Sequence, residues 1–349
     1  MGKSTQFSPI NAREAPAECP PSPVCLPPPA LGYSYSMYES FSQDIIDKYD
    51  AFILDQFGVM HNGVNAMDGA HELVNFLAKD QNKKLIVLSN TSAPAAGALV
   101  KLTTKLGFDK QDFAGMVTSG EEAARYIRNT YDKTTKCLFF TWDATIPNSP
   151  RLTAPPSAFL EKCGLSLAQS VKEADLLLLH GTEVWFRGDD EEQVSFGNFI
   201  NTGNLEETID PILQECLERK IPCVCANPDV VVQNPNGGVA YCPGLIGQRY
   251  QAMGGNVKIF GKPQPEHFEA CLRTLGLPAD RVCHVGDSLH HDIAGANMAG
   301  VDSIFITSGI HKKDLGTSFG EVAEREKIDQ LIEEVGGIVP THVIPAFRL

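Results

Sequence analysis

Short hydrophobic runs alternate with helix-like segments along the chain after residue 40. The runs lie over Ala51–Asp55, Leu85–Ser89, Val257–Gly261, Val282–Asp287 and Ser303–Thr307. Consecutive apolar residues predict strands that are covered on both faces, as in a parallel sheet between two layers of helices. The helices expected between the strands lie over Asp68–Lys79, Pro94–Leu106, Pro265–Leu275 and Asp292–Met298. This alternation predicts a doubly wound α/β fold, in which ligands bind beyond the carboxyl ends of the strands.

The middle of the chain, residues 119–240, contains strand-like runs of its own. They lie over Lys136–Thr141, Ala174–His180 and Ile221–Ala226. Reactive side chains follow strands before this segment, as at Asp55, and again after it, as at Asp287. We therefore predict that residues 119–240 form a second α/β module inserted into a core made of residues 41–118 and 241–349.

The first 40 residues differ in composition from the rest of the chain, because prolines crowd between Pro9 and Pro29. Each proline ring fixes φ and removes a backbone donor, so this segment cannot form a continuous helix. We predict that residues 1–40 are a flexible Pro-rich N-terminal arm. A ligand for a proline-binding module is the alternative.

Acidic residues outnumber basic ones, with 43 Asp and Glu against 29 Lys and Arg and a formal net charge of −14. This balance argues against a protein that coats nucleic acid or anionic membrane. No apolar run approaches the roughly 18 residues of a membrane-spanning helix, and the N-terminus has no hydrophobic signal core. The ten cysteines form no C-x-x-C pair, so a zinc ribbon is not indicated. We predict a cytoplasmic globular protein with no nucleic-acid or membrane partner.

Reactive side chains end or follow four of the predicted strands, at Asp55, Ser89, Lys262 and Asp287. Each has an ordinary explanation when taken singly, just as Asp292 is a good helix N-cap. Together they have a common chemistry, because two aspartates at one sheet edge repel each other unless a cation or a lysine neutralises them. Hard oxygen ligands of this kind suit Mg²⁺, which is the cofactor that we predict.

A phosphoryl group fits beside such an ion. Ser89 can donate its hydroxyl hydrogen to a phosphoryl oxygen, and Lys262 can supply a positive charge. A carboxylate next to the metal can attack phosphorus and form an aspartyl phosphate, which divides hydrolysis into two easier steps. The metal and the lysine would stabilise the charge that develops in the transition state.

Four motifs in chain order resemble the signatures of the haloacid dehalogenase-like (HAD) superfamily, namely Asp55-Gln-Phe-Gly-Val, Leu88-Ser-Asn-Thr, Gly261-Lys-Pro and Gly286-Asp-Ser-Leu-His-His-Asp. Further matches are His61-Asn-Gly, Ser119-Gly-Glu-Glu, Ala226-Asn-Pro-Asp and Tyr241-Cys-Pro-Gly. These are similar to class IIA members, relatives of the nitrophenyl-phosphatase and pyridoxal-phosphatase type, which carry a large α/β cap between the second and third signatures. The resemblance covers about residues 41–312. Each motif is weak alone, whereas four in order are a strong signal.

The resemblance implies a role for each matching residue. Asp55 would be the nucleophile, and Mg²⁺ would be held by Asp55, Asp287 and the backbone carbonyl of Phe57. Asp292 would support the metal site indirectly, through water or by orienting Lys262.

The resemblance also implies how a substrate is held. Ser89 and Asn90 would bind the phosphoryl group together with Lys262. Asn227 and Asp229 follow a predicted cap strand and would contact the substrate. An ordinary Asn-Pro-Asp turn is the alternative for these two residues.

One position departs from the family pattern. The phosphatases have an aspartate two residues after the nucleophile that acts as general acid and then as base, and this chain has Phe57 there. A benzyl side chain cannot move a proton, and such help is worth about 10² to 10⁴ in rate. We therefore expect slow turnover of ordinary phosphate monoesters unless another group, such as His61 or a cap residue, supplies the proton. Substrates with good leaving groups would be affected least.

The sequence thus predicts a Mg²⁺-dependent HAD-like hydrolase, a phosphatase that acts on a small phosphorylated metabolite through Asp55. The alternative is a catalytically weakened phospho-ligand-binding or regulatory protein on the same fold. Carbon–halogen or carbon–phosphorus cleavage is a third option, against which Asp287 argues because dehalogenation needs no metal. The sequence fixes neither the substrate nor the oligomeric state, and a homodimer stays open.

Overall fold

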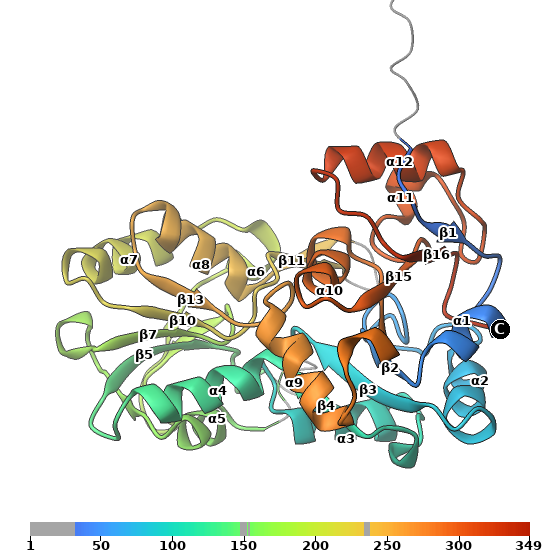
Figure 1. Ribbon diagram of the computed structural model, residues 1–349. Coiled ribbons are helices and arrows are strands. Elements are labelled where there is room, and N and C mark those ends of the chain that lie inside the picture. The colour runs from blue at the N-terminus through green and yellow to red at the C-terminus, as the bar shows by residue number, and fades with distance from the viewer. Residues whose placement is uncertain (1–31, 147–151, 153, 234–237) are drawn as a thin grey trace, which may run out of the picture. The chain divides into compact units, whose positions relative to one another are not determined.

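The computed structural model of the protein describes residues 32–146, 152, 154–233 and 238–349 (Figure 1). Residues 1–31 of the predicted N-terminal arm lie outside the described residues. An arm that reaches residue 40 is too long, because Ser36–Met37 forms strand β1 and pairs in parallel with β16, His342–Ile344. The neighbouring Tyr35 is buried, so packing as well as backbone hydrogen bonds holds this part of the chain.

A sheet that we call the core sheet has the strand order β1-β16-β15-β14-β2-β3-β4, and its neighbouring strands are all parallel. Its other strands are β2 Ala51–Leu54, β3 Lys84–Ser89, β4 Gly115–Thr118, β14 Val282–Gly286 and β15 Asp302–Ile306. This sheet confirms the predicted doubly wound α/β fold. All but one of the five predicted core runs are strands in it.

Helices cover both faces of the core sheet, which explains the uninterrupted apolar runs. Successive side chains of a strand point to opposite faces. Phe52 of β2 accordingly packs in a cluster with α2, Ala70–Asn75, while its neighbour Ile53 packs in another cluster with α9, Pro265–Leu275. A strand between two helical layers therefore needs an apolar residue at every position.

The remaining helices of the core are α1 Gln43–Lys48, α3 Ala95–Thr104, α10 Ala294–Met298, α11 Lys312–Leu315 and α12 Arg325–Glu334. Short helical turns are η1 Phe76–Asp80, η2 Lys110–Asp112, η4 Ala279–Arg281 and η5 Leu289–Ile293. The helix predicted to begin at Asp292 thus starts earlier, as the π-helical turn η5 that leads into α10. None of the helices in the described ranges is both long and apolar enough to cross a membrane.

A second sheet, which we call the cap sheet, has the order β13-β10-β7-β5-β8-β9, with β6 paired to β5. Its strands are β5 Lys136–Thr141, β6 Ser166–Leu167, β7 Leu176–Leu179, β8 Val184–Phe186, β9 Val194–Ser195, β10 Cys223–Cys225 and β13 Val257–Ile259. The helices are α4 Ser119–Thr130, α5 Pro156–Cys163, α6 Phe199–Thr202, α7 Ile209–Glu218 and α8 Pro243–Ala252, with the turn η3 Val171–Glu173. Strand β11, Val231–Gln233, pairs antiparallel with β12, Val239–Tyr241.

The run Val257–Gly261 was expected in the core sheet, and this expectation is wrong. Its strand β13 pairs in parallel with β10 of the cap sheet, in the register Cys223↔Val257. A short apolar run shows that a segment is a strand but does not show which sheet it joins. Defined by sheet membership, the inserted unit therefore continues past the predicted boundary at residue 240 and ends close to Phe260.

Candidate active site

Three buried carboxylates meet at the carboxyl end of the core sheet. Asp55 directly follows β2, Asp287 directly follows the neighbouring strand β14, and Asp292 lies in the turn η5. One carboxylate oxygen from each lies within 4.8 Å of the others. The structure thus brings Asp55 and Asp287 together, as expected for adjacent parallel strands that end at the same sheet edge.

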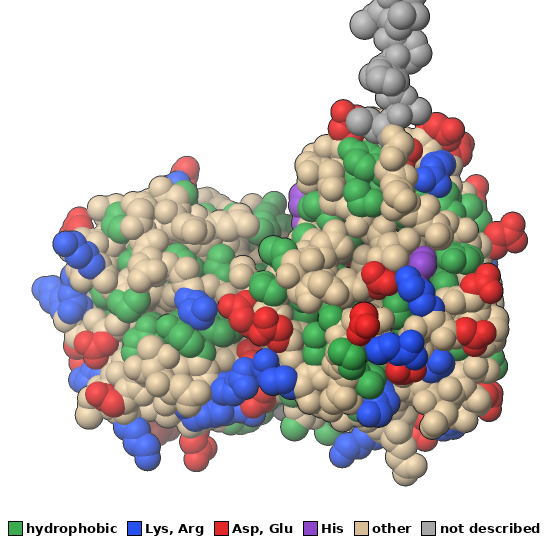
Figure 2. All heavy atoms as spheres, viewed as in Figure 1, with side chains coloured by type: hydrophobic (Ala, Val, Ile, Leu, Met, Phe, Trp, Pro, Cys, Tyr) green, Lys and Arg blue, Asp and Glu red, His purple; other side chains and the backbone are tan. Residues whose placement is uncertain are grey.

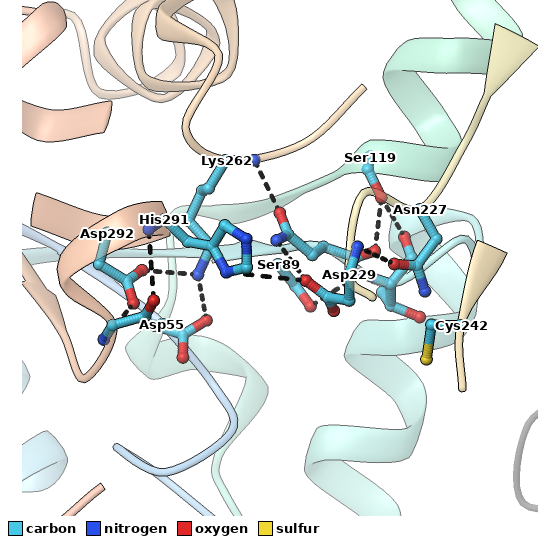
Figure 3. A network of polar contacts seen from close by, with 12 residues as sticks. Asp55, Ser89, Ser119, Asn227, Asp229, Cys242, Lys262, His291 and Asp292 are labelled. Carbon is cyan, nitrogen blue, oxygen red and sulfur yellow. Dashed lines mark hydrogen bonds and ion pairs between the residues drawn. The ribbon is translucent and has the colours of Figure 1, made fainter. Parts of the chain in front are cut away.

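Lys262 reaches these carboxylates from the cap sheet, because it follows β13. Its ammonium group contacts Asp55 and lies 2.7 Å from Oδ1 of Asp292 (Figure 3). Only 3% of Lys262 is exposed. The structure therefore places the predicted lysine in a nearly dry ion-pair cluster with two of the predicted aspartates.

Ser89 and Asn90 lie at the end of β3, which is the neighbour of β2 in the core sheet. Ser89 is buried, and its hydroxyl accepts a hydrogen bond from the backbone N–H of Thr91 at 3.3 Å. The Asn90 side chain contacts the protein itself, since its Oδ1 accepts from the backbone N–H of Lys262 and its Nδ2 donates to Asp229, both at 2.7 Å. The sequence did not indicate this bridging position of Asn90.

The loop after β10 brings cap residues into the same network. The backbone N–H of Asp229 donates to Oδ1 of Asn227 at 2.9 Å, and the Asp229 carboxylate lies 3.9 Å from Nδ1 of His291. Ser119, the first residue of α4, donates its hydroxyl to the backbone carbonyl of Asn90 at 2.7 Å. The structure thus places the predicted cap residues Asn227 and Asp229 next to core loops that carry other site residues (Figure 3).

The site carboxylates differ in their pKa values because their surroundings differ. Charged side chains at the protein surface, of which Figure 2 shows both signs on one face, are screened by solvent, whereas the site carboxylates are buried. Burial instead raises the pKa of Asp55 to about 7, against the opposing effect of Lys262. Burial, together with the charges of Asp55 and Asp292, raises the pKa of Asp287 well above its usual range.

Asp292 and Lys262 stay charged in spite of their burial. Burial alone would raise the pKa of Asp292, but Lys262 and His284 outweigh it and lower that pKa. Burial alone would lower the pKa of Lys262, but Asp292 and Asp55 outweigh it and raise that pKa. The two groups therefore form a persistent ion pair. Among the three carboxylates, Asp287 is the one whose negative charge is least offset by a neighbouring positive charge.

Asp292 is held by partners on three sides. Its Oδ1 lies 2.9 Å from Nε2 of His284 as well as near Lys262, and its Oδ2 accepts from the backbone N–H of Ser288 at 3.0 Å. These contacts suit the expected role of orienting Lys262. Sequence reasoning missed His284, although a single histidine inside the apolar run of β14 was a signal for a buried polar partner.

Glycines let two loops close around Asp287. A side chain at Gly58, which has φ +85°, or at Gly309 would overlap the Asp287 carboxylate. Oδ2 of Asp287 also accepts a hydrogen bond from the backbone N–H of Ile310 at 2.8 Å. The Gly58 of the first motif is therefore required for close approach of the chain to this carboxylate.

Phe57 and His61 lie together in the loop after β2. The Phe57 side chain is 38% exposed and meets the His61 ring edge to face, with 5.8 Å between ring centroids. Nδ1 of His61 accepts a hydrogen bond from the backbone N–H of Gly63 at 3.0 Å, so Nε2 carries the proton. Burial lowers the pKa of His61 to about 4. His61 is thus neutral near pH 7, and a neutral imidazole is a weak proton donor.

The donor set fits a hard divalent cation. When ionised, Asp55, Asp287 and Asp292 supply three negative charges in a small buried volume, and Lys262 supplies one positive charge. The pKa of Asp287 is raised first by burial and then by repulsion from Asp55 and Asp292, which Lys262 only partly offsets. A cation bound by oxygen ligands of Asp55 and Asp287 would remove this repulsion.

Two family models match the chain on either side of the central part of the cap sheet. The model described as haloacid dehalogenase-like hydrolase matches residues 52–146, and the model described as HAD-hydrolase-like matches residues 259–334. The four predicted motifs fall within these two segments.

Relatives and solved structures with the same fold match most of the chain. Chronophin from Rattus norvegicus is 23% identical over 87% of this chain and 93% of its own length. A solved "possible sugar phosphatase, HAD superfamily" from Cytophaga hutchinsonii is 19% identical, has a TM-score of 0.66 and covers 90% of this chain and 99% of its own. The p-nitrophenyl phosphatase from Archaeoglobus fulgidus is 23% identical, has a TM-score of 0.58 and covers 86% and 97% of the two chains.

Proposed function

Because this chain belongs to the haloacid dehalogenase-like hydrolase superfamily, class IIA, we propose that it is a Mg²⁺-dependent phosphatase acting on a small phosphorylated metabolite. The observation that carries the proposal is the meeting of Asp55, Asp287 and Asp292 with Lys262 in one buried cluster. Relatives that are phosphatases by name support the same reaction class. A cytoplasmic location and a homodimer stay predictions from the sequence.

Asp55 is the proposed nucleophile. One of its carboxylate oxygens attacks phosphorus, the bond from phosphorus to the leaving-group oxygen breaks, and that oxygen takes up a proton. Water then attacks the aspartyl phosphate, which releases inorganic phosphate and regenerates the carboxylate. Lys262 holds Asp55 in place, opposes the rise of the Asp55 pKa that burial causes and offers positive charge to the phosphoryl oxygens. Mg²⁺ bound by Asp55, Asp287 and the Phe57 carbonyl would supply the remaining neutralising charge.

Phe57 determines which substrates turn over fastest. No side chain at this position protonates the leaving group, so release depends on the acidity of the leaving alcohol. Aryl phosphates and other esters with acidic leaving groups are therefore the preferred class. The same lack of a general base slows attack of water on the aspartyl phosphate, so the first step outruns the second.

A leaving-group series tests the proposal. Purified full-length protein is assayed with p-nitrophenyl phosphate and with an alkyl phosphate, in Mg²⁺ and in EDTA. We expect Mg²⁺-dependent turnover of the aryl ester at least about tenfold above that of the alkyl ester. Asp55→Asn is expected to lose this activity, whereas Asp50→Asn, at an exposed aspartate paired with Arg281, keeps it. Equal aryl ester turnover by wild type and Asp55→Asn would contradict the proposal.

A phospho-ligand-binding protein on the same fold is the second candidate, and Phe57 in place of an acid–base aspartate favours it. The variant Phe57→Asp separates the two. A rise in alkyl phosphate turnover of about 10² or more shows that the remaining groups are competent for catalysis. Tight binding of a phosphate compound without turnover in either protein favours the binding function instead.

A further inference from the structure

The Asn90 side chain connects the cap loop to the backbone of Lys262. Asp229 Oδ1 accepts from Asn90 Nδ2, and Asn90 Oδ1 accepts from the Lys262 backbone N–H, each at 2.7 Å (Figure 3). We propose that Asp229 is a positioning residue, which orients Lys262 through the amide of Asn90 and does not act by contacting the substrate. This inference rests on the proposed function, because it assumes that Lys262 serves phosphoryl transfer.

The orientation of an amide between these partners is unambiguous. A carboxylate only accepts and a backbone N–H only donates, so Asn90 must turn its amino group to Asp229 and its oxygen to Lys262. The flipped amide would face an N–H with its own N–H groups and a carboxylate with its oxygen. The Asp229 charge thus fixes the acceptor that holds the Lys262 N–H, and hydrogen bonds to charged groups are stronger than neutral ones.

The backbone next to Lys262 has little room to move. Gly261 has φ +116°, and a side chain there would lie 2.5 Å from Cγ of Pro228 and 2.7 Å from Oδ1 of Asn90. The Gly261 N–H donates to Nε2 of the buried His267 at 3.0 Å. Both successive N–H groups, of Gly261 and Lys262, therefore have side-chain acceptors, and the cap loop packs directly on this segment.

Asp229 itself is held in a fixed loop. Its N–H donates to Asn227 Oδ1 at 2.9 Å, and its carbonyl accepts from the N–H of Gly244, the second residue of α8, at 3.0 Å. A side chain at Gly244 would overlap the carbonyl of Pro228. The carboxylate is thus presented to the core by a loop that is anchored in the cap.

The same carboxylate also approaches the turn that carries Asp292. His291 Nδ1 lies 3.9 Å from Asp229 Oδ1, and His291 directly precedes Asp292 in η5. Asp292 in turn lies 2.7 Å from the Lys262 ammonium. Asp229 therefore stands between two loops that fix the two ends of the Lys262 residue, its backbone N–H and its Nζ.

The test combines kinetics with amide exchange in the full-length protein. Asp229→Ala is compared with Asp210→Ala. The Asp210 side chain is 17% exposed, against 21% for Asp229, and it pairs with Arg249 within the cap. We expect Asp229→Ala to lower kcat about tenfold to hundredfold, equally for p-nitrophenyl and alkyl phosphate, with KM changed less than about threefold. We expect faster hydrogen exchange at the Lys262 amide, and no such change in Asp210→Ala.

Two further variants define the pathway. Asp229→Asn keeps an oxygen acceptor for Asn90, so we expect recovery of most of the lost kcat and of the slow exchange at Lys262. Asn90→Ala combined with Asp229→Ala is expected to lose no more than Asn90→Ala alone, because both act through one bond. If the alanine variant fails to fold, the asparagine variant and its exchange at Lys262 carry the test.

Several outcomes would overturn the inference. Asp229 would be a substrate contact if Asp229→Ala leaves hydrogen exchange at Lys262 unchanged and, at the same time, lowers kcat or raises KM to a different extent for the two substrates. Unchanged exchange and unchanged kinetics would make it irrelevant to the site. Absence of metal-dependent turnover in wild type would overturn the proposed function alone, because exchange at Lys262 is measured without substrate.

Discussion

In the core sheet, the adjacent parallel strands β2 and β14 lead into the carboxylates Asp55 and Asp287, whereas in the cap sheet the adjacent parallel strands β10 and β13 lead into Asp229 and Lys262. Both sheets thus follow the rule that functional side chains lie beyond the carboxyl ends of parallel strands. The edge of the core sheet supplies a surplus of negative charge. The edge of the cap sheet supplies the positive charge of Lys262 and the residue proposed to position it, Asp229. The site requires both edges, so neither sheet alone provides the proposed chemistry.

The largest expected effect comes from removal of the cation that the cap sheet contributes. Lys262→Met keeps an unbranched side chain that is one atom shorter, but it leaves Asp55 and Asp292 without their shared partner. We expect kcat to fall at least about 10³-fold and the free energy of unfolding to fall by about 3 kcal/mol, because a buried charge loses its partner. Phosphatase assays and urea denaturation measure the two effects.

The matched control is Lys258→Met, on β13 of the same sheet. The Lys258 ammonium lies 5.3 Å from the ring centres of both Tyr126 and Phe260, away from the carboxylates. Its substitution is expected to leave kcat unchanged. Similar losses in the two variants would mean that the cap sheet contributes general packing rather than a specific cation.

A smaller effect is expected from a buried histidine of the cap. Burial lowers the pKa of His180 to about 3, from the usual 6.5. The unfolded chain therefore binds a proton that the folded protein does not bind between these pH values, so stability falls as pH drops through 6.5. Between pH 7 and pH 5 the loss from this residue is about 2 kcal/mol.

His180→Gln should remove that part of the pH dependence. Urea denaturation measures the free energy of unfolding at pH 7 and at pH 5. We expect the difference between these two values to be about 2 kcal/mol smaller in the variant than in wild type. An unchanged difference would contradict a neutral, buried His180. The histidine packs against Phe139 and Phe159 and bonds to Thr141, so the variant is expected to be less stable at both pH values.

The smallest effect concerns the surplus charge of the core edge. The raised pKa of Asp287 means that its ionised form costs stability, and this cost grows as pH rises above the usual pKa of the group. In EDTA at pH 8 we expect Asp287→Asn to be more stable than wild type by about 1 kcal/mol. Asparagine can still accept the Ile310 N–H.

Addition of Mg²⁺ should reverse this order. The metal stabilises wild type by binding the folded state, and the variant lacks one ligand. Thermal unfolding with and without Mg²⁺ measures the difference, and the exposed Asp280→Asn serves as control. If Asp287→Asn is instead less stable than wild type in EDTA, the negative charge of Asp287 is stabilised by a partner other than a metal.

The sequence predicted the carboxylate side of the site better than the cap side. Asp55 and Asp287 end runs whose apolar pattern identifies them as buried strands of one parallel sheet, so their meeting followed from the fold class. The membership of β13 in the cap sheet could not be predicted, because a three-residue strand carries no periodic signal about its neighbours. For the same reason the two-residue strand β1 was assigned to the arm.

The bridging role of Asn90 depends on contacts that are remote in the chain. Its two amide partners are 139 and 172 residues away, at Asp229 and Lys262. No local pattern records such distances, and the motif containing Asn90 indicated phosphoryl binding instead. His284 left a detectable signal, because a polar residue inside a buried strand needs a partner. That partner, Asp292, was already among the predicted site residues.

Trapping of the intermediate shows whether Asp55 forms a covalent bond to phosphorus. Wild type is mixed with p-nitrophenyl phosphate and Mg²⁺, quenched in acid during the first turnover, and digested for mass spectrometry. Because Phe57 cannot activate water, we expect the phosphorylated enzyme to accumulate, with the added phosphoryl group on the peptide that contains Asp55. We expect no such group in Asp55→Asn. If wild type releases nitrophenolate steadily while the phosphoryl group is found on another residue, or on none, Asp55 is not the nucleophile.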